Sequence, residues 1–232
     1  MQQYAKWIYL GQRNPRLTKE EFSARWLSHR RIGTKPEMVA EFIGATYGAV
    51  RLKSPDHDYL SDEYDAIGLF ALEGLHSIPT IARILKSDYI QADERRFFIS
   101  TSDTFSIFCQ ENVIRNGPET EAVAVQFLRR PDGATPNDFM KGWEEQGAGI
   151  LERSSFAGKV ARYVRNVVCA PPPPGFGYDG VAELWFDSAE SMAAAAPEMN
   201  AIMVEAAFID PANSLWVMTD VVMSRQRKDL AG

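Results

Sequence analysis

The feature that most constrains the fold is a short pattern that occurs twice in the chain. Residues 18–29 read T-K-E-E-F-S-A-R-W-L-S-H, and residues 135–146 read T-P-N-D-F-M-K-G-W-E-E-Q. In both copies a threonine stands three positions before an acidic residue, which is the signature of a helix N-cap. Phenylalanine and tryptophan follow four residues apart, so they share one face of the predicted helix. The chain is therefore predicted to contain the same capped, amphipathic helix twice.

Further matches extend this repeat along the chain in the same order. The matching pairs are Arg13 and Arg130, Tyr64-Asp65 and Tyr178-Asp179, and Ser106-Ile107-Phe108 and Ser214-Leu215-Trp216. The separation between partners shrinks along the chain, as expected if the loops differ while helices and strands are retained. We therefore predict an internal duplication with units at residues 1–116 and 121–232, because Gly117-Pro118 marks a loop between them.

Each half is predicted to follow the order β-α-β-β-α-β. Aromatic and β-branched runs predict strands at 4–12, 43–52, 64–72, 105–115, 122–129, 160–168, 178–186 and 214–224. Second helices are expected at 77–92 and 188–207, the latter broken or kinked at Pro197. Such a unit forms a four-stranded antiparallel sheet with two helices on one face. We therefore expect an α+β fold in which two sheets meet face to face or rim to rim, around a ligand-sized hollow.

Composition excludes several classes of protein. The net charge is −6, and no long run of lysine or arginine indicates a nucleic-acid or membrane partner. The apolar runs are strand-sized and the N-terminus lacks a signal-peptide pattern, which favours a cytoplasmic protein. Cys109 and Cys169 are too few for a disulfide framework. The spacing of His29, His57 and His76 indicates no metal site, and no nucleotide-binding glycine motif is present, so we predict no metal and no cofactor.

Three stretches resemble an EthD-type domain. Residues 10–29 contain L-x-x-R-x-P-x-L-T-x-x-E-F-x-x-x-W-x-x-H, residues 178–188 read Y-D-G-V-A-E-L-W-F-D-S, and residues 208–216 read F-I-D-P-A-N-S-L-W. The resemblance covers nearly the whole chain as two tandem copies. It implies the dimeric α/β-barrel superfamily, with two ferredoxin-like βαββαβ repeats forming a pseudo-dimeric barrel within one chain.

The resemblance also implies a range of functions. The superfamily includes cofactor-free monooxygenases, lactone isomerases, dehydratases, decarboxylases and haem enzymes, and fungal EthD-type proteins are associated with dehydration or decarboxylation of aromatic polyketides. The family's histidine at the end of the first helix matches His29, whereas the second copy has Gln146. The family's Y-x-x-N on the second strand matches Tyr163 and Asn166, while Tyr47 lacks the asparagine. Only one half is therefore expected to use histidine chemistry.

His29 is the leading candidate for proton transfer. An imidazole has an unperturbed pKa of about 6.5, so its neutral form can act as a base near neutral pH. Its spacing from Phe22 and Trp26 places it on their helical face and directs it towards the sheet. The alternative is a structural histidine that is satisfied by a backbone carbonyl near the helix C-terminus.

Other candidates would bind the substrate or stabilise its charge. Tyr9 and Gln126 occupy equivalent strand positions and are expected to point inward, as are Tyr47 and Tyr163. A tyrosine in an apolar pocket can donate to a developing oxyanion, although it can equally be a core residue with a backbone partner. The Arg13 guanidinium suits a carboxylate ligand, and the alternative is a solvated charge on a loop. The remaining candidate substrate-binding residues are Trp26, Gln146 and Asn166.

The leading hypothesis is a cofactor-free lyase, a dehydratase or decarboxylase, that acts on a small aromatic or polyketide-like substrate in the barrel. His29 would move the proton, and one or more of Tyr9, Tyr47 and Tyr163 would stabilise the enolate or phenolate, with Tyr47 as the candidate catalytic residue. An arginine would hold a carboxylate. The alternatives are an oxidoreductase of the same superfamily, either a cofactor-free monooxygenase or a haem enzyme, and a non-catalytic binding barrel. A homodimer of pseudo-dimers is also compatible with the sequence.

Overall fold

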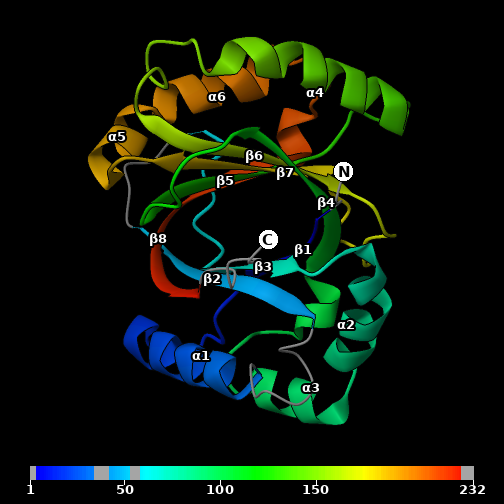
Figure 1. The fold of residues 1–232 in the computed structure, drawn as a ribbon. Helices are drawn as coiled ribbons and strands as arrows, with labels where there is room; N and C mark the ends of the chain where they lie inside the picture. Colours follow the sequence, from blue (N-terminus) through cyan, green and yellow to red (C-terminus); the bar gives the residue numbers. More distant parts are fainter. Residues whose placement is uncertain (1–3, 34–41, 53–57, 226–232) are drawn as a thin grey trace, which may run out of the picture.

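The computed structural model describes residues 4–33, 42–52 and 58–225, which form eight strands and six α-helices (Figure 1). The first half contains β1 (Ala5–Gly11), α1 (Lys19–Gly33), β2 (Ile43–Arg51), β3 (Ala66–Leu72), α2 (Ile78–Leu85), α3 (Asp88–Glu94) and β4 (Ser106–Arg115). The second contains β5 (Ala122–Leu128), α4 (Pro136–Ile150), β6 (Val160–Val168), β7 (Gly180–Phe186), α5 (Ala189–Ala194), α6 (Ala196–Glu205) and β8 (Leu215–Arg225).

The order of elements agrees with the prediction, but the second helical segment of each half is divided. Pro197 lies in the first turn of α6, where its missing N–H costs nothing, and it separates α6 from α5 as expected. In the first half, Ser87 has extended backbone angles and separates α2 from α3. This second division was not predicted, because no proline or glycine marks it.

The eight strands form one closed antiparallel barrel. Their order is β1-β3-β2-β8-β5-β7-β6-β4, so the halves join rim to rim at β2–β8 and at β4–β6. Figure 1 shows α1, α2 and α3 over one outer face of the barrel and α4, α5 and α6 over the opposite face. Closure pairs every strand on both sides, so the barrel has no open sheet edge.

Side chains from both halves pack into the lumen of the barrel. Ile8, Leu69 and Ile107 are buried on β1, β3 and β4, at positions that the register places side by side. The ring of Tyr47 meets that of Trp185, with centroids 5.4 Å apart. The cavities described below lie outside the barrel, and the ligand-sized hollow between the sheets stays a prediction. Both faces of each strand are apolar since one faces the lumen and the other the helices.

A charged network crosses the lumen. Lys6 Nζ lies 2.9 Å from Glu111 Oε2 and 2.5 Å from Glu183 Oε1. Glu183 also accepts hydrogen bonds from Asn166 Nδ2 at 2.7 Å and from Trp185 Nε1 at 3.0 Å. Burial lowers the pKa of Lys6, but the two carboxylates outweigh this effect and the pKa is raised overall, so Lys6 stays protonated. The network ties β1 and β4 of the first half to β6 and β7 of the second.

Both predicted helix caps are present. At α4, Asp138 N donates to Thr135 Oγ1 at 3.2 Å, and Thr135 N donates to Asp138 Oδ2 at 2.9 Å. At α1, Glu21 N donates to Thr18 Oγ1 at 3.2 Å, and Thr18 N donates to Glu21 Oε2 at 2.8 Å. These reciprocal bonds satisfy two backbone N–H groups at each helix start, as the sequence pattern predicts.

Removing the second cap should cost a small, measurable amount of stability. Thr135→Ala is expected to lower the free energy of unfolding by about 1 kcal/mol, because Asp138 N loses its acceptor. Urea denaturation measures the change, and Thr135→Ser, which keeps the hydroxyl, is the matched control. Equal stability of the alanine and serine variants would show that the cap contributes nothing.

Candidate functional site

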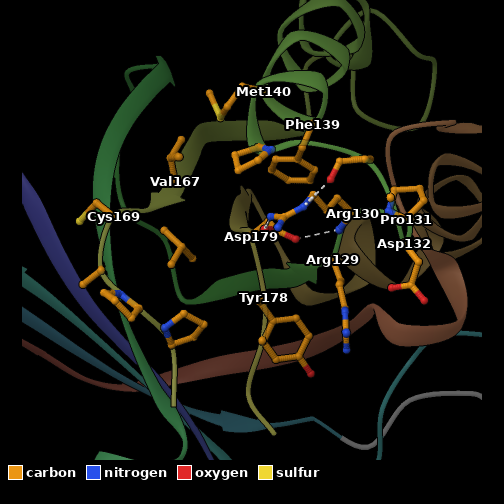
Figure 2. A pocket seen from close by; sticks show the side chains of 18 residues that line it. Arg129, Arg130, Pro131, Asp132, Phe139, Met140, Val167, Cys169, Tyr178 and Asp179 are labelled. Atoms are coloured by element: carbon orange, nitrogen blue, oxygen red, sulfur yellow. Dashed lines mark hydrogen bonds and ion pairs between the residues drawn. The ribbon is translucent and has the colours of Figure 1, made fainter. Parts of the chain in front are cut away.

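A cavity of about 530 Å³ lies beside the start of α4, outside the barrel (Figure 2). We call it the α4 groove. One wall consists of Phe139 and Met140 from α4, and another of the end of β6 with the proline-rich loop that follows. Arg129, from the loop after β5, and Tyr178, just before β7, complete the groove. The groove therefore combines apolar walls with a few polar groups, as small-molecule sites do.

An arginine–aspartate pair shapes the base of the groove. The Arg130 guanidinium contacts the Asp179 carboxylate, and Arg130 N donates to Asp179 Oδ2 at 2.9 Å. The first half has the same arrangement, since Arg13 N donates to Asp65 Oδ2 at 2.9 Å and the Arg13 guanidinium also contacts Leu17 O. Both arginines therefore hold the loop after a first strand, and Arg13 does not present a free guanidinium to a ligand.

Arg129 is the cation that the groove does present. Its side chain is exposed, and no hydrogen bond or ion pair engages its guanidinium among the residues that the structure describes. Figure 2 shows it beside Tyr178. Burial, followed by the proximity of Tyr64, raises the pKa of Tyr178 well above its usual range, so the phenol remains a neutral donor. The repeat pairs Arg130 with Arg13, and no sequence signal pointed to Arg129.

Cys169 lies on the wall of the groove opposite Arg129. Burial raises the pKa of its thiol, so the neutral form dominates at neutral pH. Because the thiolate is the nucleophilic form of cysteine, the wall at this point acts as an apolar surface.

His29 connects two helices. Its Nδ1 lies 2.6 Å from Asp93 Oδ2, its Nε2 lies 3.9 Å from Glu94 Oε1, and its ring packs on Phe97 with centroids 4.9 Å apart. The expectation that His29 points towards the sheet is corrected, because these partners belong to α3 and the residues that follow it. The partner seen among the described residues is a carboxylate, whereas the alternative interpretation expects a backbone carbonyl. The predicted role in proton transfer stays a prediction.

Glu94, beside His29, makes the stability of the first half dependent on pH. It accepts hydrogen bonds from Ser102 N at 2.7 Å and Ser102 Oγ at 2.6 Å. Burial outweighs these bonds and raises the pKa of Glu94 to about 7 from an ordinary value of 4.5. The folded protein therefore binds this proton more tightly than the unfolded chain does, and the resulting stabilisation is complete only below pH 4.5.

The free energy of unfolding should consequently fall between pH 4.5 and 7, as the Glu94 contribution is lost. The loss amounts to about 3 kcal/mol, from about 1.4 kcal/mol for each pKa unit. Denaturation of wild type and of Glu94→Gln at several pH values in this range measures the loss. His29 and Asp93 are common to both proteins, so the difference between the two profiles reports on Glu94. Glutamine keeps the neutral shape, so the variant should show a flatter profile. Parallel profiles would contradict the assignment.

Trp26 and Tyr9 form a pair between α1 and the sheet. Trp26 Nε1 donates to the Tyr9 hydroxyl at 2.7 Å, and both side chains are buried. Tyr9 therefore faces the helices, which corrects the expectation that it points into the lumen. Tyr47 does face the lumen, and its hydroxyl donates to the Glu119 carboxylate. The substrate-binding roles of Tyr9 and Trp26 and the catalytic role of Tyr47 stay predictions.

The second-half candidates are also dispersed. Tyr163 is buried beneath α4 and hydrogen-bonds with Trp143, and burial raises its pKa. Gln126 is buried on the helix-facing side of β5, so the expectation that it points into the lumen is corrected as well. Gln146 lines another cavity, of about 430 Å³, between α4 and Phe208. Asn166 faces the lumen network, so the structure does not bring the predicted residues into one site.

The predicted absence of a local metal motif can be compared with the structure. No cluster of three or more histidine, cysteine, aspartate or glutamate side chains suited to a metal ion occurs in residues 4–33, 42–52 and 58–225, and His57 lies outside them. A haem on His29 does not fit the geometry. Nδ1 is engaged by Asp93, and Nε2 faces the buried Glu94 carboxylate at 3.9 Å, where a porphyrin would need space.

The fold and the groove can now be compared with known proteins. Residues 131–212, which include most of the α4 groove, match the EthD domain family. No curated protein sequence matches the chain. Within the described part of the chain, no helix is long and apolar enough to cross a membrane.

Solved structures share the architecture over nearly the whole chain. An anthrone oxidase-like protein has a TM-score of 0.62 and 10% identity, with 99% of this chain and 95% of that chain covered. A proposed monooxygenase from Fusobacterium nucleatum has a TM-score of 0.56 and 10% identity, with coverages of 97% and 95%. A proposed chlorite dismutase has a TM-score of 0.55 and 10% identity, with coverages of 96% and 96%. The chain has the dimeric α/β-barrel fold, and its second half contains an EthD domain.

Proposed function

We propose that the protein is a cofactor-free oxidoreductase that oxidises a small hydroxyaromatic compound bound in the α4 groove. The observation that carries the proposal is the groove itself, where apolar walls face an exposed and unengaged Arg129 in the half that matches the EthD domain. The named structural neighbours, an anthrone oxidase-like protein and a proposed monooxygenase, fit this function better than the lyase hypothesis.

The chemistry requires molecular oxygen and a substrate that forms a stable anion. A hydroxyaromatic compound with an activated ring CH₂ group loses a proton, and its carbanion gives an electron to O₂. The resulting carbon radical and superoxide combine to form a peroxide. The O–O bond of this peroxide breaks as water leaves, so that CH₂ and O₂ become C=O and H₂O. Arg129 stabilises the substrate oxyanion electrostatically, and Phe139 and Met140 exclude water from the ring.

Oxygen uptake with a panel of hydroxylated anthrones, whose ring CH₂ group becomes the carbonyl, tests the proposal. Enzyme-dependent oxygen consumption with formation of the ketone or quinone is expected, and the stoichiometry should be one O₂ per carbonyl formed. Absence of oxygen uptake across the panel, with loss of CO₂ or water from the same compounds, would replace the oxidoreductase by the lyase.

We also infer that the two halves are copies of one unit, at residues 1–116 and 121–232. The matching helix caps and the matching arginine–aspartate pairs support this inference, as does the shared strand order, β4-β1-β3-β2 and β8-β5-β7-β6. The copies differ in their polar side chains, so the proposed activity needs only the second half to provide the groove.

A further inference from the structure

A buried arginine beneath α4 has no counter-ion among the residues that the structure describes. Arg165 is only 6% exposed, on the helix-facing side of β6. Its Nη1 donates to Trp143 O at 2.7 Å, and its guanidinium lies 5.8 Å from the ring centroids of both Trp143 and Tyr163. Arg165 Nε has no hydrogen-bond partner, and no carboxylate among the described residues pairs with the group. Buried charges are normally paired, so this donor lacks an anionic acceptor.

A second buried donor without a partner lies in the same row of the sheet. The register places Gln126, Ala182 and Arg165 side by side on β5, β7 and β6. Gln126 is 3% exposed, and its Nε2 has no hydrogen-bond partner in the described part of the chain. The two outer strands are about 10 Å apart, and only the methyl group of Ala182 lies between them. An unpaired amide N–H and an unpaired guanidinium N–H therefore flank a small side chain beneath α4.

The first half shows that the fold does not require this polar row. The equivalent register there is Tyr9, Gly68 and Gly48. The ring of Tyr9 covers Gly68 so closely that a Cβ at that position would overlap it, and its hydroxyl pairs with Trp26. That place is filled by the protein's own aromatic ring and contains no cation, whereas the second half has two donors and a methyl group.

The polar row is adjacent to the α4 groove. The next row of the sheet contains Gly180 and Val167, and Val167 lines the groove. The rings of Trp143 and Phe139 lie directly over Gly180, and Phe139 also lines the groove. Two aromatic side chains therefore separate the groove from the unpaired donors, so a ligand from the groove reaches these donors only when the two side chains move.

We propose that Gln126, Ala182 and Arg165 form an anion subsite that binds the carboxylate or phenolate oxygen of a small aromatic ligand entering from the α4 groove. Arg165 supplies the positive charge, the Gln126 amide supplies a second donor, and Ala182 places only a methyl group between them. The subsite rests on the proposed function, because that function identifies the ligand as the substrate. Its test measures binding, so that it can fail or succeed independently of oxygen uptake.

The probes are p-nitrophenol, whose anion absorbs visible light, and its neutral ether p-nitroanisole. The wild-type chain is expected to bind the phenolate at least tenfold more tightly than the ether and to lower the apparent pKa of bound p-nitrophenol. Gln126→Leu should weaken phenolate binding about tenfold and leave ether binding unchanged, since one charge-assisted hydrogen bond is lost. Ala182→Leu should abolish binding of both probes by filling the space.

Arg165→Met should remove the preference for the phenolate. Gln91→Leu on α3 is the matched control for Gln126→Leu, and it should bind both probes as wild type does. If Arg165→Met does not fold, Gln126→Leu and Ala182→Leu decide the outcome. Wild-type affinity for the phenolate in both of these variants would overturn the subsite. Phenolate binding that depends on Gln126 without any oxygen uptake would retain the subsite and overturn the oxidoreductase.

Discussion

Replacing Lys6 by methionine is expected to lower the free energy of unfolding by about 3–5 kcal/mol, because it leaves two buried carboxylates without their cation. Lys6 Nζ lies 2.9 Å from Glu111 Oε2 and 2.5 Å from Glu183 Oε1, and all three side chains are nearly inaccessible to solvent. Methionine has a similar volume, so the effect comes from charge and not from a cavity. Urea denaturation at neutral pH measures it.

The loss in Lys6→Met should come from the cation that the carboxylates of Glu111 and Glu183 no longer face. Lys141→Met is the matched control, since Lys141 is exposed and lies 3.9 Å from Glu145 on the same helix. It should change stability by less than about 0.5 kcal/mol. A Lys6→Met variant as stable as Lys141→Met would show that the network does not hold the halves together.

Local patterns in the sequence predicted the parts of the fold that depend on local interactions. Thr18 and Thr135 cap their helices because the partners of each hydroxyl lie three residues away. Pro197 divides a helix because proline cannot donate the hydrogen bond that the helix interior needs. The strands followed from their aromatic and β-branched residues. Whether the two sheets meet face to face or rim to rim was left open, and the barrel was implied by the EthD resemblance.

The sequence could not show which side of each strand faces the lumen. Alternation separates two faces, but both are buried in a closed barrel, so Tyr9 and Gln126 were assigned to the wrong one. Lys6 carried no signal either, because its partner Glu183 is 177 residues away. Arg13 is likewise engaged by Asp65, which is 52 residues away, and its role in ligand binding stays a prediction. The positions of Lys6 and Arg13 in the fold therefore depend on polar contacts between residues far apart in the sequence.

Arg129→Gln is expected to lower kcat/KM for an anionic hydroxyaromatic substrate by about 10- to 100-fold, the range for a lost hydrogen bond to a charged group. The same variant should have little effect on a neutral analogue in which the ionisable hydroxyl is methylated. Arg25→Gln is the control, because Arg25 is an exposed arginine on α1, far from the groove in sequence and fold. Equal losses for both substrates would indicate that Arg129 supports the groove without contacting the anion.

The same assay with His29→Gln separates the two chemistries that the sequence left open. In the oxidoreductase proposed here the substrate lies in the α4 groove, while His29 is engaged by Asp93 in the first half. Oxygen uptake by His29→Gln should therefore stay within about threefold of wild type, provided that the variant folds. A general base is typically worth about 10²- to 10⁴-fold in rate. A loss of that size in folded His29→Gln, with Arg129→Gln unaffected, would move the site to His29 and restore the histidine mechanism that the EthD resemblance implies.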